Sequence, residues 1–207
     1  MTDITVAPSR RRETTRAKLF EAAAQVFAEV GMDAASVEMI CDRAGFTRGA
    51  FYSNFESKDQ LFLELITHMT EAKLDEVAVR VRAIEPGEIA DPAALVHQII
   101  GVSEGAGMEP QLVSELRTQA LRDPRMAEAY LAWHDGIIGR VEQIIDEVTA
   151  LHPVRLRLTA PQAARLLVDI ADDTCVRAAI EGCSRAQTEE LLKERLQQIV
   201  VALVDIG

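Results

Sequence analysis

The segment SVEMICDRAGFTRGAFYSNFESK, residues 36–58, decides the fold of this chain. Apolar residues recur in it at the spacing of two short helices that meet at Gly45. Ser36 and Thr47 stand where helix N-caps are expected, because their hydroxyls can accept hydrogen bonds from the first helical turn. Two short helices around a glycine-containing turn are typical of a helix-turn-helix. The segment therefore predicts a DNA-binding motif whose second helix is the recognition helix.

The predicted recognition helix has one face for the core and one face for solvent. Phe51 and Phe55 are four positions apart and are expected to face the core. Arginine can donate to guanine edges, asparagine can pair with adenine, and glycine lets the backbone approach a groove closely. The outward side chains that suit base edges are Arg48, Gly49, Ser53 and Asn54, and those that suit phosphates are Thr47, Tyr52 and Lys58. On these residues alone, an ordinary helical hairpin with a solvated polar face is the alternative.

Helical periodicity extends to both sides of this segment. Residues 1–12 are polar and basic and predict a disordered arm. A first helix is expected over residues 13–30, with Gly31 as its end. Its apolar stripe consists of Leu19, Ala22, Ala23, Val26, Phe27 and Val30.

The remainder of the chain also predicts helices, separated by proline and glycine. They are expected over residues 58–82, 92–102, 110–122, 124–151, 160–181 and 187–206. No strand-like alternation of useful length occurs. The sequence thus predicts an all-α fold of about nine helices, with an arm (1–12), a three-helix helix-turn-helix domain (13–58) and a helical ligand-binding and dimerisation domain (59–207).

The net charge of −11 is unevenly distributed. Residues 1–60 contain 8 Lys and Arg against 9 Asp and Glu, whereas residues 61–207 contain 14 against 24. Contact with phosphate needs a local cationic surface rather than a basic whole chain. The acidity of the second part is therefore compatible with a DNA-binding first part.

Several function classes lack their signatures. No apolar run is long enough for a membrane span, no secretory signal is visible, and the three cysteines form no CxxC pair, which predicts a cytoplasmic protein. The four histidines have no HxxxH or HExxH spacing, so neither a metal nor another cofactor is expected. Neither GxSxG, a P-loop nor Rossmann glycines are present, so we do not expect an enzyme.

The N-terminal pattern resembles the tetracycline-repressor (TetR) family over about residues 14–65. The resemblance runs through Leu19 to Ala23, Val26, Phe27, Gly31, Ser36, Ile40, Cys41, Ala44 to Thr47, Gly49, Tyr52, Phe55, Lys58 and Leu61. In this family, residues matching Ser36, Thr47, Ala50, Tyr52 and Lys58 meet phosphates. Those matching Arg48, Gly49, Ser53 and Asn54 lie at or near base edges.

Four positions depart from the family pattern. Cys41 replaces the usual alanine, Phe46 a smaller aliphatic residue, and Ser36 the commoner threonine. Glu38 stands where some relatives place a cation against DNA. We assign Glu38 no DNA contact, because a carboxylate near phosphate repels, and expect it to favour the helix dipole instead.

For residues 59–207 the resemblance implies a ligand cavity and a homodimer made by helices 160–181 and 187–206. It implies a regulator, most simply a repressor, that binds double-stranded DNA at a palindromic operator and is released by a small-molecule effector. Control by a protein partner without such an effector is the alternative. Candidate ligand contacts are Arg117, Trp133, His134 and Asp172, although core packing or surface pairing explains each of them as well.

Overall fold

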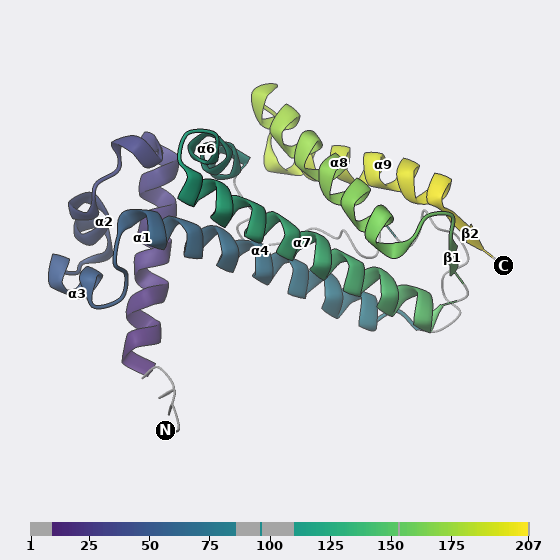
Figure 1. The fold of residues 1–207 in the computed structure, drawn as a ribbon, viewed down its shortest axis with the longest axis horizontal. Helices are drawn as coiled ribbons and strands as arrows, with labels where there is room; N and C mark the ends of the chain where they lie inside the picture. Colours follow the sequence, from purple (N-terminus) through teal and green to yellow (C-terminus); the bar gives the residue numbers. More distant parts are fainter. Residues whose placement is uncertain (1–9, 86–95, 97–109, 153, 207) are drawn as a thin grey trace. The chain divides into compact units, whose positions relative to one another are not determined.

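The computed structural model describes residues 10–85, 96, 110–152 and 154–206 (Figure 1). Within these residues the chain is all-α, as the sequence predicts, apart from two three-residue strands. The helix expected over residues 92–102 and most of the arm expected over residues 1–12 lie outside the described residues. None of the described helices is long and apolar enough to cross a membrane. Contacts divide the chain into two compact units that meet between Thr67 and His68.

The first unit contains three helices and the start of a fourth. In order, they are α1 (Arg10–Ala34), α2 (Val37–Ala44), α3 (Arg48–Tyr52) and α4 (Lys58–Arg82). Helix α1 begins at Arg10, three residues before the predicted start. Gly31 has φ 78° and ψ 165°, which breaks the helical path before one further turn to Ala34. The predicted helix end at Gly31 is thus a kink, and glycine adopts this positive φ without a Cβ clash.

Aromatic rings form the centre of the first unit. Phe51 and Phe55 are at most 1 % exposed, and their ring centroids lie 5.7 Å apart. Phe27 on α1 meets Phe62 on α4 edge to face, with centroids 5.2 Å apart. Burying one such side chain contributes about 1.5–3 kcal/mol. Helix α3 has five residues and would not be stable alone, so its position depends on this burial.

Arg16 links α1 to α4 and to the segment that follows α3. Its Nη1 donates to the main-chain oxygen of Asn54 at 3.0 Å, and its guanidinium forms an ion pair with Glu64 on α4. The guanidinium carbon also lies 4.4 Å from the centroid of the Phe55 ring. None of these contacts is evident from the sequence. They place Arg16 between α1, the segment after α3, and α4.

The second unit is a layered set of long helices (Figure 1). It contains the rest of α4 together with α6 (Pro110–Ala120), α7 (Pro124–Leu151), α8 (Ala160–Ile180) and α9 (Arg185–Leu203). Asp123 caps α7 by accepting from the N–H of Arg125 at 2.8 Å, as the Asp-Pro pair predicts. Two ion pairs, Arg82 with Glu147 and Arg140 with Asp75, join α4 to α7.

A short antiparallel ribbon departs from the sequence prediction. Strand β1 (Val154–Leu156) pairs with β2 (Val204–Ile206). The last helix, expected over residues 187–206, therefore ends at Leu203. Val154 and Val204 are both buried in a cluster with Ala78, Val81, Ile84, Ile144 and Val148. The ribbon therefore packs its apolar side against α4 and α7. Three-residue strands are too short for their alternation to show in the sequence.

The position of Arg16 generates a prediction about stability. Replacing Arg16 with alanine removes charge-assisted hydrogen bonds from a half-buried site, so we expect a loss of about 1–3 kcal/mol in the free energy of unfolding. Arg16→Lys should restore only part of it, because an ammonium lacks the planar face that lies over Phe55. Chemical denaturation followed by circular dichroism measures both.

Arg43→Ala is the matched control for this prediction. Arg43 pairs with Glu29 on the surface, where the two side chains are 38 % and 54 % exposed. Such an exposed pair contributes little to stability, because water screens it. Equal losses for Arg16→Ala and Arg43→Ala would contradict the structural role of Arg16.

Candidate DNA-binding and effector sites

Helices α2 and α3 both begin with a hydroxyl cap. Ser36 Oγ accepts from the N–H of Met39 at 3.1 Å, and Thr47 Oγ1 accepts from the N–H of Ala50 at 3.2 Å. In both caps the oxygen acts as acceptor, which leaves the hydroxyl hydrogen available as a donor. Either side chain can therefore cap its helix and donate to a phosphate at the same time.

The turn between the two helices is fixed by its backbone. Gly45 adopts the left-handed conformation with φ 70°, and the next residue, Phe46, donates its N–H to the carbonyl of Cys41 at 2.9 Å. This pattern satisfies carbonyls at the end of α2. Cys41 is 2 % exposed, and burial raises the pKa of its thiol, so it packs as a small apolar residue.

The exposed face of α3 carries several of the predicted contact residues. Arg48, Gly49, Tyr52 and Ser53 are exposed, whereas Phe51 between them is fully buried. The arrangement follows from the aromatic core beneath the helix, which fixes its rotation. Contact of these residues with DNA stays a prediction.

Ser53 and Asn54 point back to the helix. Ser53 Oγ donates to the carbonyl of Ala50 at 2.9 Å, and Asn54 Nδ2 donates to the same carbonyl at 2.8 Å. Both side chains satisfy the carbonyl that the short helix leaves open. A base-edge role for Asn54 therefore requires its amide to leave this hydrogen bond.

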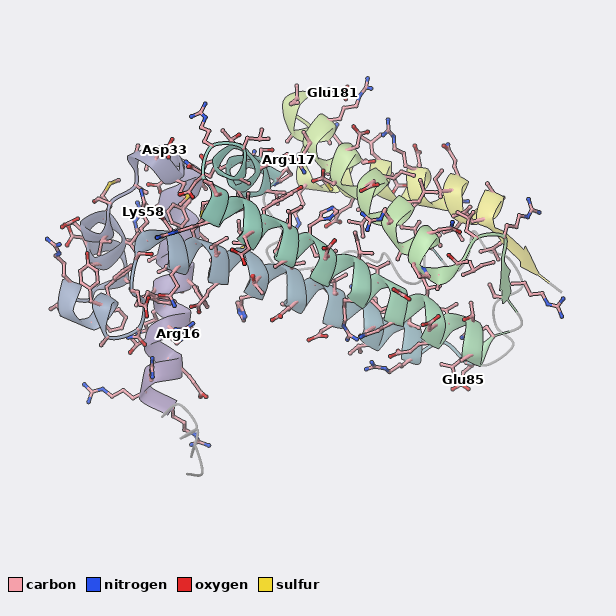
Figure 2. All side chains as sticks on the ribbon, in the orientation of Figure 1. Arg16, Asp33, Lys58, Glu85, Arg117 and Glu181 are labelled. Atoms are coloured by element: carbon pink, nitrogen blue, oxygen red, sulfur yellow. The ribbon has the colours of Figure 1, made fainter. Side chains whose placement is uncertain are left out.

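Lys58 is engaged within the protein. Its Nζ donates to the carbonyls of Met32 at 2.6 Å and Ala35 at 2.8 Å, between the end of α1 and the start of α2 (Figure 2). An ammonium has three N–H donors, so one remains for a phosphate. Both carbonyls are more than twenty residues from Lys58 along the chain, so local sequence patterns could not predict these hydrogen bonds.

Arg48 forms an ion pair with Glu38. The two residues lie at the starts of α3 and α2, and Arg48 Nη1 is 2.7 Å from Glu38 Oε1. The ring of Tyr52 lies 5.9 Å from the guanidinium carbon. The pKa of Arg48 is raised, first by its hydrogen bond with Tyr52 and then by the negative charge of Glu38. From its place in α2 alone, Glu38 was expected only to favour the helix dipole.

A second site joins α6, α7 and α8 within the second unit. Arg117 Nη2 lies 2.6 Å from Asp172 Oδ2, and its Nε donates to the hydroxyl of Tyr130 at 3.3 Å (Figure 2). Tyr130 stacks on His134 with centroids 5.8 Å apart, and contacts Trp133 at the same distance. The four candidate ligand residues thus belong to one network through Tyr130, which the sequence analysis did not include.

Trp133 extends this network to α4. Its Nε1 donates to Thr70 Oγ1 at 3.3 Å, and Thr70 is 6 % exposed. Arg117 and Asp172 are each about one third exposed, at 37 % and 35 %. Half-exposed aromatic rings beside a charged pair can bind a molecule that has an apolar body and one polar group.

Comparison with known proteins supports the first site. The profile described as "Bacterial regulatory proteins, tetR family" matches residues 19–65. The Escherichia coli K12 regulator UidR is 24 % identical over 158 residues, which is 76 % of this chain and 78 % of UidR. AcrR from Shigella flexneri is 32 % identical over 88 residues, 42 % of this chain and 39 % of AcrR.

Among solved structures, reduced E. coli NemR has the same fold. It superposes with a TM-score of 0.68 at 18 % sequence identity, covering 94 % of this chain and 98 % of NemR. The family profile is confined to the first unit and the start of α4, whereas the fold similarity extends over both units. The similarity of the second unit is therefore one of architecture.

The backbone at Gly49 generates the second prediction. A Cβ at this position would meet only Thr47 Oγ1 at 3.7 Å, so the fold itself does not require glycine. Gly49→Ala should raise stability by up to about 1 kcal/mol through helix propensity. If α3 enters a groove, the added methyl group should nevertheless weaken DNA binding by about 1–3 kcal/mol, the scale of one lost base contact.

Gly136→Ala on α7 is the control for Gly49→Ala, because a Cβ there meets nothing within 4 Å. It should stabilise the protein without changing DNA affinity. Thermal unfolding and fluorescence-anisotropy titration of labelled duplex DNA measure the two quantities. Unchanged DNA affinity in Gly49→Ala would remove this part of α3 from the interface.

Proposed function

Because the chain belongs to the tetR family of bacterial regulatory proteins, we propose that it is a repressor that binds a palindromic operator as a homodimer. As a member of this family it is a helix-turn-helix transcriptional regulator and not an enzyme. One observation carries the proposal: α3 exposes Arg48, Gly49 and Tyr52 while Phe51 anchors the helix in the core. Repression follows if the occupied operator overlaps a promoter.

Helices α8 and α9 are the proposed dimer surface. They pack against each other as a hairpin (Figure 1), which the ion pair of Arg195 with Asp173 supports at 2.9 Å. Ile180 is 81 % exposed and Val201 is 47 % exposed, although both are apolar. Val201 also borders a hollow of about 290 Å³ on α9, together with Glu194, Gln197 and Gln198. A second copy related by a two-fold axis would cover these apolar side chains.

A two-fold dimer determines the form of the operator. It presents two copies of α3 to the DNA, related by the same symmetry axis as the protein. The half-sites are therefore expected to be inverted repeats, spaced so that both recognition helices reach successive major grooves.

Val201→Glu tests the proposed dimer. Since Val201 is exposed in the single chain, the variant should fold, but its carboxylate would be forced into an apolar contact. We expect dimerisation to weaken by more than about 2 kcal/mol, and operator affinity to fall with it. Analytical ultracentrifugation measures the association, and circular dichroism checks the helix content.

Val79→Glu on α4 is the control, because Val79 is 62 % exposed on another helix. It should remain dimeric. Leu196, on the buried side of α9, is unsuitable because it is 8 % exposed within the chain and a charge there would disturb folding. A folded, dimeric Val201→Glu protein would place the interface elsewhere.

We also propose that an apolar effector of drug or metabolite size binds beside the Arg117 network and releases the protein from DNA. The support is the connection of four helices through Thr70, Arg117, Trp133 and Asp172. A ligand that competes for Arg117 or Asp172 would separate α6 from α8. Such a ligand lowers DNA affinity only by the difference in its own affinity for the two states.

Trp133 provides the readout for this proposal, because it is the only tryptophan of the chain. Compounds that release labelled operator DNA should also change its fluorescence. Arg117→Gln should weaken binding of those compounds by about 1.5–3 kcal/mol, the contribution of a hydrogen bond to a charged group. Arg82→Gln breaks a comparable pair between α4 and α7 away from the aromatic rings, and should leave compound binding unchanged.

Two outcomes would count against the effector site. Compounds that release DNA without any change in Trp133 fluorescence would place their binding elsewhere in the second unit. If no compound in a broad library releases the DNA, the alternative of control by a protein partner is favoured.

A further inference from the structure

We propose that Glu38 is a positioning residue for sequence readout, which holds Arg48 in the orientation that reads a guanine edge. The proposal rests on the proposed DNA-binding role of α3 and adds to it a residue outside that helix. Glu38 would lower the affinity of the protein for DNA in general and raise its preference for one base.

The geometry joins two helices across the turn. Glu38 is the second residue of α2 and Arg48 the first residue of α3, and the 2.7 Å contact between Oε1 and Nη1 connects them. The two side chains are 52 % and 61 % exposed. They therefore lie on the solvent side of the motif, on the same surface as the rest of the exposed face of α3.

The contact leaves Arg48 able to bind a base. A guanidinium has five N–H donors, and Glu38 engages Nη1 alone. The guanidinium carbon of Arg48 also lies 5.9 Å from the centroid of the Tyr52 ring, and this ring limits the orientation of Arg48 from a second side. Held between Glu38 and Tyr52, Arg48 retains donors for the O6 and N7 acceptors of a guanine.

An ion pair this exposed contributes little to folding stability, because water screens it and two long side chains lose freedom. Its effect on binding is larger. Arginine that is already ordered loses less conformational entropy when it meets a base, so the correct contact gains affinity. The same ordering of Arg48 does not strengthen binding to a wrong base, because that base does not offer acceptors where the fixed N–H donors point.

The charge of Glu38 acts in the opposite direction on phosphates. A carboxylate beside the DNA surface offsets part of the attraction that Arg48 provides, and this attraction is what supports binding to any sequence. Specificity is the ratio of the two affinities. Glu38 should therefore reduce non-specific binding while it preserves the specific contact.

Asp42 allows the two effects of Glu38 to be separated. It lies one turn further along α2, is exposed, and forms no ion pair within the described part of the chain. Asp42→Asn removes the same charge from the same helix without touching Arg48. It serves as the control for a change in general electrostatics.

The experiment uses the full chain and a randomised duplex DNA library. Sequence preferences are selected for the unmodified protein, Glu38→Gln, Arg48→Ala, the double variant and Asp42→Asn. We expect Glu38→Gln to lose preference by about fivefold or more at the base pair where Arg48→Ala also loses it. Its affinity for non-specific DNA should rise. In the Arg48→Ala background, Glu38→Gln should change no base preference.

Three results would overturn the proposal. Glu38→Gln could bind all sequences more tightly with preferences unchanged, as Asp42→Asn should, which would make Glu38 a general charge only. It could alter preferences equally in the Arg48→Ala background, which would make Glu38 itself a base contact. If the unmodified protein selects no sequence at all, the proposed function fails together with this inference, whereas the first two results leave that function intact.

Discussion

The burial of Phe51 and Phe55 is the constraint on which the DNA-binding unit depends. Helix α3 is only five residues long, so its own hydrogen bonds cannot hold it in place. Two rings fixed in an aromatic core determine both its position and its rotation about its axis. With Phe51 held in the core, Arg48 and Tyr52 lie to either side of it around the helix and remain exposed. Arg16 completes the anchor from outside by binding the segment that follows α3.

The sequence predicted those features that depend on neighbours along the chain. The caps at Ser36 and Thr47, the turn at Gly45 and the buried faces of α1 and α3 all follow from local spacing, and each is present except at Val30, which is 40 % exposed at the end of its stripe. Contacts between distant segments could not be predicted in the same way. Lys58 meets a carbonyl in the last turn of α1 and another just after that helix, and Glu38 meets Arg48 across a turn. No period in the sequence indicates which partner a charged side chain will choose.

The polar residues of the motif serve structure and function at once. Ser53 and Asn54 satisfy the same carbonyl of α3, while Lys58 is shared between two carbonyls and solvent. Binding to DNA would have to compete with these internal hydrogen bonds or use the donors they leave over. A list of polar side chains on one face therefore overestimates the number available to a ligand, and the internal partners determine which ones remain. Arg48 keeps donors beyond the one that Glu38 engages, and Lys58 keeps one beyond the two that its carbonyls engage.

The ribbon of β1 and β2 has a consequence for the order in which the second unit is assembled. Its register pairs Leu156 with Val204, which closes a loop of about fifty residues around α8 and α9. Closing so long a loop costs entropy before the contacts at its ends compensate, so the ribbon should form after the α8–α9 hairpin during folding. Once closed, it prevents α9 from separating from α8 at its last turn. In native-state hydrogen exchange the hairpin and the ribbon should therefore open as one cooperative unit rather than helix by helix.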